Sequence, residues 1–508
     1  MSLRIKTAKN VASGWLSLLI HVAVGFFLSP FILHKLGDAA FGLWVLIFSL
    51  TGYYGLFDFG IRSSVVRYVA RFAASQDADQ LTRFLNTSVA TYGLVALMVL
   101  VVTGIGSFYL GSLFQIPPNL LQTARWLLVL VGTEVALGFP LSVFVGVIEG
   151  LQRFSWVNLA QIGCTLIRAL FVVIVLNRGQ GLLSVALITV TLNLVSHALL
   201  AGMAFRVMPL RLEAKFVDRR AFRQMINYGW AAFLIMVAEK LRFGSDAAVI
   251  GVFLSSTAIT YFAVGLRLVE YPATVVQSLA LVFTPMSSHF DALGDHDRLQ
   301  KVLLAGNRAC AMTIFPMCAT LIILGKPILE AWVGNRYLSS YAILVALVVP
   351  RTLYLAQSAS TKILLGMGLH RVLALVLLLE GASNMVLSIL LLRHFGILGV
   401  AVGTAIPLAC TSLFFLPRHV CHLLRVPMGS FLSEAYLMPL VLCAPVVVTL
   451  LVLRHSFQVR SYRDLLLQLS AAAVVYGLAL LWLFFTREPE GMSLRMRFAQ
   501  FRQQAFGP

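Results

Sequence analysis

Long apolar segments recur along nearly the whole chain, and they constrain its fold more than any other feature of the sequence. Residues 94–102, for example, are all apolar and lie within a longer hydrophobic segment. A helix needs about 20 apolar residues to cross the hydrocarbon core of a bilayer, so segments of this kind predict transmembrane helices. Charged residues make up only 12% of the 508 residues, whereas soluble domains contain about 25%. The composition therefore excludes a soluble enzyme, a secreted disulfide protein and a disordered chain.

The predicted fold class is all-α, a polytopic membrane protein whose helices follow one another through short loops. One helix with its loop takes up roughly 35 residues, which leaves room for about 14 spans. Uninterrupted apolar runs argue against an outer-membrane barrel, whose strands alternate polar and apolar side chains. We place the helices at residues 11–33, 40–70, 85–110, 123–148, 156–176, 182–205, 228–254, 258–287, 302–323, 341–365, 372–392, 398–417, 435–453 and 465–485.

The chain is strongly basic, with a formal net charge of +19 from 39 Lys and Arg against 20 Asp and Glu. Nucleic acid is not the expected partner of so hydrophobic a chain. The basic residues favour one set of alternate loops by roughly two to one, which predicts that both termini are cytoplasmic. The remaining excess suits an anionic substrate or the anionic headgroups of the phospholipid bilayer.

The longest polar loop, residues 206–223, divides the chain near its middle and predicts two pseudo-symmetric lobes of six helices each. When the first half is shifted by 218 positions, Trp44 meets Phe262, and the turn at residues 77–81 (DADQL) meets the turn at 295–299 (DHDRL). Such a parallel repeat is expected about an axis along the membrane normal. The predicted organisation is an N-terminal lobe (1–206), a basic cytoplasmic linker (207–227), a C-terminal lobe (228–420), accessory helices (421–486) and a basic cytoplasmic tail (487–508).

Ionisable side chains lie in the middle of several predicted helices, where each marks a protein interior, a cavity or an ion pair. Pairing that merely holds helices together remains one interpretation. Their concentration near the helix centres favours the other, a water-filled cavity between the lobes. The positions are Asp58 and Arg62 at a spacing of four, the stripe Glu239, Arg242 and Asp246 beside Lys240, Arg267 with Glu270, Arg351 near Tyr354, Glu134, Glu380 with Asn384, and the face Gln161, Thr165 and Arg168.

The sequence lacks the motifs that enzymes and nucleotide-binding proteins use. It contains no G-x-x-x-x-G-K-[ST], no H-E-x-x-H and no G-x-S-x-G, and its His and Cys residues are scattered. Short outer loops also argue against a sugar polymerase or a glycosyltransferase. We therefore expect no enzymatic activity, no catalytic residues, no metal site and no cofactor.

Three motifs in the first half carry a family resemblance: residues 36–44 (LGDAAFGLW), 56–60 (LFDFG) and 65–70 (VVRYVA). They are similar to the polysaccharide-transporter branch of the MOP flippase superfamily, the Wzx-like O-antigen and exopolysaccharide flippases, and the similarity extends weakly through 246–251 and 258–264. The resemblance implies two lobes around a V-shaped cavity and a place in the bacterial inner membrane. It also implies transfer of undecaprenyl-diphosphate-linked oligosaccharide between leaflets, for polysaccharide and lipopolysaccharide synthesis.

A flippase of this kind must carry a diphosphate and a glycan through the membrane, which suggests a role for each embedded charge. Guanidinium groups bind phosphate oxygens bidentately, so the bases are candidate contacts to the substrate. These are Arg62, Lys240, Arg242, Arg267 and Arg351. The acids are expected to hold those bases in place or to bind a coupling ion, H⁺ or Na⁺. These are Asp58, Glu239, Asp246 and Glu270.

Other functions stay open at this stage. A cation-coupled multidrug exporter of the same superfamily predicts a more acidic and aromatic cavity. Lipid II flippases carry an Arg pair in helix 2, where this chain has Tyr53 and Tyr54. A scaffold that only binds the polysaccharide polymerase and glycosyltransferases is a third alternative. We expect a monomer that moves by alternating access, with one lobe rocking against the other.

Overall fold

The computed structural model describes residues 3–208, 211–457, 459 and 462–486, and these ranges form helices joined by short loops, without a strand. The predicted all-α class is confirmed, whereas the predicted basic tail, 487–508, lies outside the described residues. The first half consists of α1 (Leu3–Leu36), α2 (Asp38–Gly52), η1 (Tyr53–Asp58), α3 (Ile61–Ser75), α4 (Ala78–Leu113), α5 (Pro118–Gly150), α6 (Phe154–Asn177) and α7 (Leu182–Val207).

The second half follows a short linker that contains η2 (Ala214–Phe216). Its elements are α8 (Arg219–Phe243), α9 (Asp246–Phe253), α10 (Ser256–Ala280), α11 (Phe283–Ala292), α12 (His296–Val333), η3 (Asn335–Tyr337), α13 (Ser340–Ala356), α14 (Ser358–Gly366), α15 (His370–Phe395), α16 (Ile397–Cys410), η4 (Thr411–Phe415), α17 (Leu416–Leu423), α18 (Met428–Leu432), η5 (Ser433–Leu437), α19 (Met438–Ser456) and α20 (Tyr462–Thr486).

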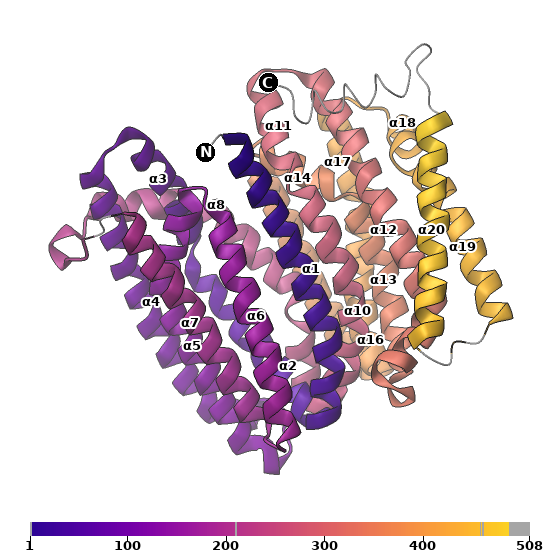
Figure 1. Cartoon of the computed structure of the whole chain (residues 1–508), viewed down its shortest axis with the longest axis horizontal. Helices are drawn as coiled ribbons and strands as arrows, with labels where there is room; N and C mark the ends of the chain where they lie inside the picture. Colours follow the sequence, from indigo (N-terminus) through magenta and orange to yellow (C-terminus); the bar gives the residue numbers. More distant parts are fainter. Residues whose placement is uncertain (1–2, 209–210, 458, 460–461, 487–508) are drawn as a thin grey trace.

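Figure 1 shows the early helices α4, α5 and α7 on one side of the molecule and the later helices α12, α19 and α20 on the other. α1 packs against α6 of the first half and also touches α12 of the second, while α2 packs along α10. The start of α1 and the end of α20 lie at the same end of the molecule (Figure 1). This arrangement is compatible with the predicted even number of crossings.

Twelve of the described helices are long and apolar enough to cross a membrane, or thirteen when α13 and α14, bent by 45°, count as one span. This number is compatible with the fourteen predicted spans. The place of the seventh predicted helix, 228–254, is taken by α8 and α9, and the charges at Glu239, Lys240 and Arg242 make α8 unusually polar. α8 packs against α3 and α4 of the first half and against α15 of the second, so protein surrounds much of it.

The second predicted helix, 40–70, is not continuous. It is broken into α2, η1 and α3 at Phe59 and Gly60, which adopt left-handed backbone conformations with φ of 48° and 72°. A Cβ at Gly60 would lie 2.3 Å from the carbonyl oxygen of Gly229 on α8. Because only glycine lacks a Cβ, Gly60 permits both the turn and this close approach of two backbones.

The predicted repeat has a structural basis in two equivalent helix caps. The Asp77 carboxylate accepts a hydrogen bond of 3.0 Å from the Gln80 backbone N–H at the start of α4. The Asp295 carboxylate does the same for Arg298 at the start of α12, also at 3.0 Å. The residue that precedes each cap, Gln76 or Gly294, has a positive φ. The shared sequence pattern therefore encodes the same turn in both halves.

Removal of either cap is expected to destabilise the protein modestly. Asp77→Ala and Asp295→Ala should each lower the free energy of unfolding by about 1 kcal/mol, because a backbone N–H at the helix start loses its acceptor. Heat denaturation of the protein purified in detergent checks this. Lys301→Ala, at an exposed position on α12, is the control, and equal stability of all three variants would contradict the assignment.

The two halves meet tightly where α1 ends and α2 begins. The Thr260 hydroxyl on α10 donates a hydrogen bond of 2.6 Å to the carbonyl oxygen of Asp38. The Tyr337 hydroxyl donates to the Asp38 carboxylate, and the Arg336 guanidinium lies 2.5 Å from it. The largest apolar core cluster also joins residues of α1 and α2 to α10, α12 and α13. We call this contact region the α2–α10 seal.

Candidate functional site

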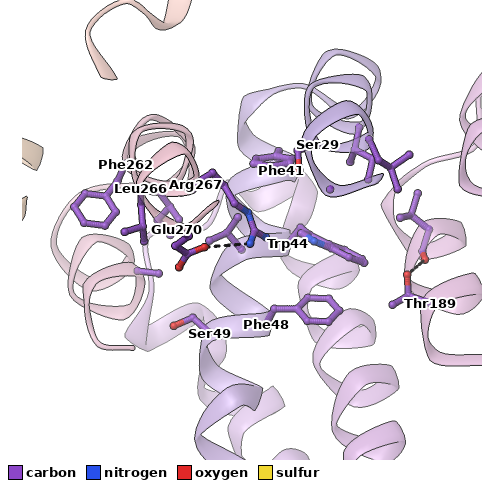
Figure 2. A pocket seen from close by; sticks show the side chains of 18 of the residues that line it. Ser29, Phe41, Trp44, Phe48, Ser49, Thr189, Phe262, Leu266, Arg267 and Glu270 are labelled. Carbon is purple, nitrogen blue, oxygen red and sulfur yellow. Dashed lines mark hydrogen bonds and ion pairs between the residues drawn. The ribbon is translucent and has the colours of Figure 1, made fainter. Parts of the chain in front are cut away.

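A cavity of about 640 Å³ lies between the halves, and we call it the central cavity (Figure 2). Its walls come from α1, α2, α6 and α7 of the first half and from α8, α9 and α10 of the second. In Figure 2, Arg267 extends from α10 toward Trp44 of α2, which lies beside Phe41 and Phe48. Both halves therefore contribute side chains to one polar and aromatic space.

Four of the predicted site residues line the central cavity: Lys240, Asp246, Arg267 and Glu270. The Arg267 guanidinium lies 3.3 Å from the Glu270 carboxylate one turn along α10, and both side chains remain about half exposed. Such an exposed pair contributes little to stability, because solvent screens it and its side chains lose entropy. Arg267 can therefore exchange part of this contact for another hydrogen-bond acceptor at little cost.

A second cavity, of about 590 Å³, lies between α8, α10, α13, α14 and α15, and we call it the lateral cavity. Two further predicted residues, Glu239 and Arg351, line it. Lys240, Phe243 and Gly244 line both cavities. Lys240 thus lies on the wall between them, and its ammonium group approaches Gly52 at the end of α2.

Arg242 lies outside both cavities, although it belongs to the predicted stripe on helix 228–254. Its side chain is only 1% exposed and forms an ion pair with Glu380 of α15. The guanidinium carbon lies 4.0 Å from the centre of the Tyr354 ring, and Asn384 donates a hydrogen bond of 2.8 Å to the Arg242 carbonyl oxygen. Its observed role is to hold α8 to α15.

Arg62 and Asp58 also lie apart from the two cavities. The spacing of four favours an ion pair between them, but the Arg62 guanidinium binds the Glu149 carboxylate of α5 at 2.8 Å. Only the Arg62 backbone N–H reaches Asp58, at 3.2 Å, and Asp58 also accepts a hydrogen bond from the Tyr92 hydroxyl. The break at Gly60 explains the difference, because residues on either side of it do not share one regular helix.

Asp246 has the most enclosed carboxylate among the predicted acids, with 5% of the residue exposed. The Thr404 hydroxyl lies 3.1 Å from its Oδ1 and 3.0 Å from the amide oxygen of Asn384. Ser388 donates a hydrogen bond of 2.9 Å to the same amide oxygen. Oxygen atoms from α9, α15 and α16 therefore gather beside the central cavity, which is the ligand type that hard cations prefer.

Sequence reasoning missed several lining residues. Arg168 of α6 lines the central cavity and brings a base from the first half; the sequence placed it on a polar face with Gln161 and Thr165 but not among the predicted substrate contacts. Lys362 and Thr361 of α14 line the lateral cavity. They lie near the end of predicted helix 341–365. A Lys at the end of a transmembrane helix commonly extends to the membrane–water interface, so its position alone does not indicate a cavity.

The fold and the cavities together define a class, a membrane transporter in which two halves enclose a shared polar space. Residues 36–342 match the family described as polysaccharide biosynthesis protein, and the chain belongs to this family. The family resemblance expected from the sequence is thereby confirmed.

Relatives of known name cover most of the chain. The uncharacterized membrane protein EpsK of Bacillus subtilis is 21% identical over 84% of this chain and 86% of its own length. A protein of Haloferax volcanii described as probable low-salt glycan biosynthesis flippase Agl15 is 20% identical over 75% of this chain and 77% of its own.

Solved structures of similar fold cover most of the chain. The lipid II flippase MurJ in an inward closed conformation gives a TM-score of 0.73 over 94% of this chain and 99% of its own, at 15% identity. An inward-facing multidrug resistance MATE transporter of the MOP superfamily gives 0.70 over 82% and 96%, at 12% identity. At these identities the likeness establishes the MOP fold alone.

Proposed function

We propose that the chain is a flippase that moves an undecaprenyl-diphosphate-linked oligosaccharide from the inner to the outer leaflet of a bacterial inner membrane. The observation that carries this proposal is the central cavity, in which Arg168 of the first half faces a space shared with Lys240 and Arg267 of the second. A lipid-linked glycan has an anionic, hydrophilic head and an apolar tail. Only the head needs a polar cavity, because the tail can stay in the surrounding lipid.

Alternating access fits the way in which the halves meet. The α2–α10 seal closes one end of the central cavity, and rocking of the lobes would open it while closing the other end. The positive-inside rule supports a cytoplasmic location of both termini, so that the seal faces the opposite side of the membrane. In this mechanism the protein works as a monomer and catalyses no covalent chemistry.

Asp246 is the best-placed candidate for a coupling ion. Its buried carboxylate and the oxygens of Thr404 and Asn384 form a cluster that H⁺ or Na⁺ would suit. Because Asp246 also lines the central cavity, ion binding there can respond to whether the cavity is occupied. The polysaccharide polymerase and glycosyltransferases remain the proposed protein partners, since they consume and supply the substrate.

Loss of a cavity base tests the proposed function directly. Lys240→Ala and Arg267→Ala, at equal expression in a deletion strain, should each reduce surface polysaccharide at least about tenfold. A lost charge-assisted hydrogen bond costs about 1.5–3 kcal/mol, and 1.4 kcal/mol corresponds to about tenfold. The substrate should accumulate on the inner leaflet of both variants. Arg206→Ala, an exposed base on α7 outside both cavities, is the control, and undiminished export by both cavity variants would refute these contacts.

The multidrug exporter is disfavoured by the charges of the central cavity, where three bases, Arg168, Lys240 and Arg267, face two acids, Asp246 and Glu270. The cavity of an exporter of organic cations is expected to have more acidic than basic side chains. Drug resistance on expression would favour the exporter, accumulation of lipid II in a depleted strain would favour the lipid II flippase, and complementation by a transport-dead variant would favour the scaffold.

A further inference from the structure

The lateral cavity has a composition unlike that of the central cavity. Three bases line it against a single acid, Glu239. Hydroxyl and amide side chains also line this cavity, and among them the Thr274 and Ser278 hydroxyls already donate to carbonyl oxygens of α10. The bases are Lys240, Arg351 and Lys362, and the uncharged polar residues are Thr274, Gln277, Ser278, Ser358 and Thr361.

Several of these donors have no protein partner. The Arg351 Nε and the Thr361 hydroxyl are buried without a hydrogen bond. Within the part of the chain that the structure describes, no ion pair involves Arg351, Lys362 or Glu239. A buried donor without an acceptor is costly, so this arrangement is expected to be most stable when an anion occupies the cavity.

Arg351 is held in a defined orientation for such a ligand. Its guanidinium carbon lies 3.9 Å from the centre of the Phe243 ring, in a cation–π contact. This contact holds the guanidinium in place, and its N–H groups can bind two oxygens of one phosphate. Phe243 also lines the central cavity, so the stacked pair stands at the boundary between the two spaces.

The two cavities are consecutive along α10. Arg267 and Glu270 belong to the central cavity, and Thr274, Gln277 and Ser278 belong to the lateral cavity. Spacings of three and four residues place them along one face of the helix. α10 begins at the α2–α10 seal, so the central cavity lies nearer the closed end and the lateral cavity lies farther from it.

The central cavity has more aromatic side chains in its wall than the lateral cavity, where Phe243 and Tyr354 are the aromatic lining residues. Phe41, Trp44 and Phe48 of α2 lie together in its wall (Figure 2). Flat apolar rings of this kind pack against the C–H faces of sugar rings, while the nearby charges can bind hydroxyl groups. In a lipid-linked glycan the diphosphate connects the sugars to the tail, so it must occupy a place adjacent to the sugars.

We infer that the lateral cavity is a diphosphate subsite, in which Arg351, Lys362 and Lys240 bind the two phosphate groups while the glycan occupies the aromatic central cavity. This inference rests on the proposed function and divides its substrate between two compartments. Lys240, on the shared wall, contacts the phosphate nearest the first sugar. Arg351 and Lys362 make the lateral cavity selective for a diphosphate, because their positive charges attract two phosphate groups far more strongly than a neutral glycan.

Direct binding of inorganic pyrophosphate tests the subsite without any requirement for transport. Calorimetric titration of the full chain in detergent should give saturable binding that is weaker for inorganic phosphate. The double variant Arg351→Gln/Lys362→Gln should bind pyrophosphate at least about tenfold more weakly, since each lost charge-assisted bond is worth about that factor. Lys362→Arg, which keeps the charge at that position, leaves Arg351 in place and reports on folding, should retain most of the affinity.

Two further variants make the test specific. Arg206→Gln/Arg219→Gln removes two exposed bases outside both cavities and should leave pyrophosphate binding unchanged. Trp44→Ala should also leave pyrophosphate binding unchanged but should reduce export of the lipid-linked oligosaccharide, because it alters only the glycan compartment. Comparable loss of pyrophosphate affinity in the Trp44→Ala variant would overturn the division into two compartments.

The subsite and the proposed function can fail separately. Absence of saturable pyrophosphate binding by the wild-type protein, or wild-type affinity in Arg351→Gln/Lys362→Gln, would overturn the subsite even if export is normal. If pyrophosphate binds as expected but reconstituted protein moves no lipid-linked oligosaccharide, the diphosphate subsite stands and the flippase proposal fails.

Discussion

Gly42→Val is expected to prevent closure of the α2–α10 seal and to reduce export by at least about a hundredfold. A Cβ at Gly42 would lie 1.7 Å from the carbonyl oxygen of Ser256 and 2.9 Å from the Thr260 hydroxyl. The first of these atoms is backbone and cannot move without displacing the start of α10. Overpacking typically costs 1–3 kcal/mol and more where the neighbours cannot adjust, with about 1.4 kcal/mol per tenfold change in population.

The measurement combines export at equal expression with hydrogen–deuterium exchange of residues 38–44 and 256–262, which should become less protected. Gly104→Val is the matched control, because a Cβ at Gly104 on α4 meets no atom within 4 Å. Normal export by Gly42→Val together with unchanged exchange would show that this contact is not a moving part of the transport cycle.

Polar contacts across the seal are expected to persist at physiological pH. Burial and the hydrogen bond to Asp38 raise the pKa of Tyr337 above its ordinary value. The Tyr337 hydroxyl therefore remains protonated, and so remains a donor to Asp38, throughout the neutral range. Opening of the seal must break this bond and the ion pair between Arg336 and Asp38. Polar contacts therefore stabilise the closed state in addition to apolar packing.

Glu380→Ala is expected to cause the largest loss of stability of any single substitution in the second half, about 3–5 kcal/mol. It leaves the Arg242 guanidinium, which is 1% exposed, without its carboxylate partner. Two of the Arg242 nitrogens already have no hydrogen-bond acceptor, and the neighbouring Tyr354 ring offers only a cation–π contact. The double variant Arg242→Met/Glu380→Leu removes both charges and should recover most of the stability.

Heat denaturation in detergent checks the stability, and export at equal expression checks the role in transport. The double variant should still export polysaccharide, because Arg242 lies outside both the central and the lateral cavity. A double variant that is stable but inactive would instead place Arg242 in the transport mechanism. Recovery of neither property would indicate that the pair specifies the packing of α8 against α15.

The embedded charges show what helical periodicity can predict about a side chain and what it cannot. The stripe Glu239, Arg242 and Asp246 was identified from spacing, yet Glu239 lines the lateral cavity, Asp246 the central cavity, and Arg242 neither. For Asp246 the cause is local, since α8 ends at Phe243 and α9 begins at Asp246, so that Asp246 is not on the α8 face. Glu239 and Arg242 share α8, and they differ because Arg242 is buried against Glu380 of α15.

The helices and their caps could be predicted from the sequence alone, because both depend on residues that are close together along the chain. In a membrane each segment must satisfy its own backbone hydrogen bonds, so an apolar run of sufficient length becomes a helix whatever surrounds it. The caps at Asp77 and Asp295 likewise use residues three positions away, and so this shared turn was visible in the sequence.

The partners of the embedded charges were decided only by the tertiary structure. Arg62 binds Glu149, 87 positions away, rather than Asp58, and Arg242 binds Glu380, 138 positions away. Periodicity determines which face of a helix a side chain occupies, but not which helix that face meets. The separation of a central from a lateral cavity arises in the same way, because it depends on how α8, α10 and α13 pack together.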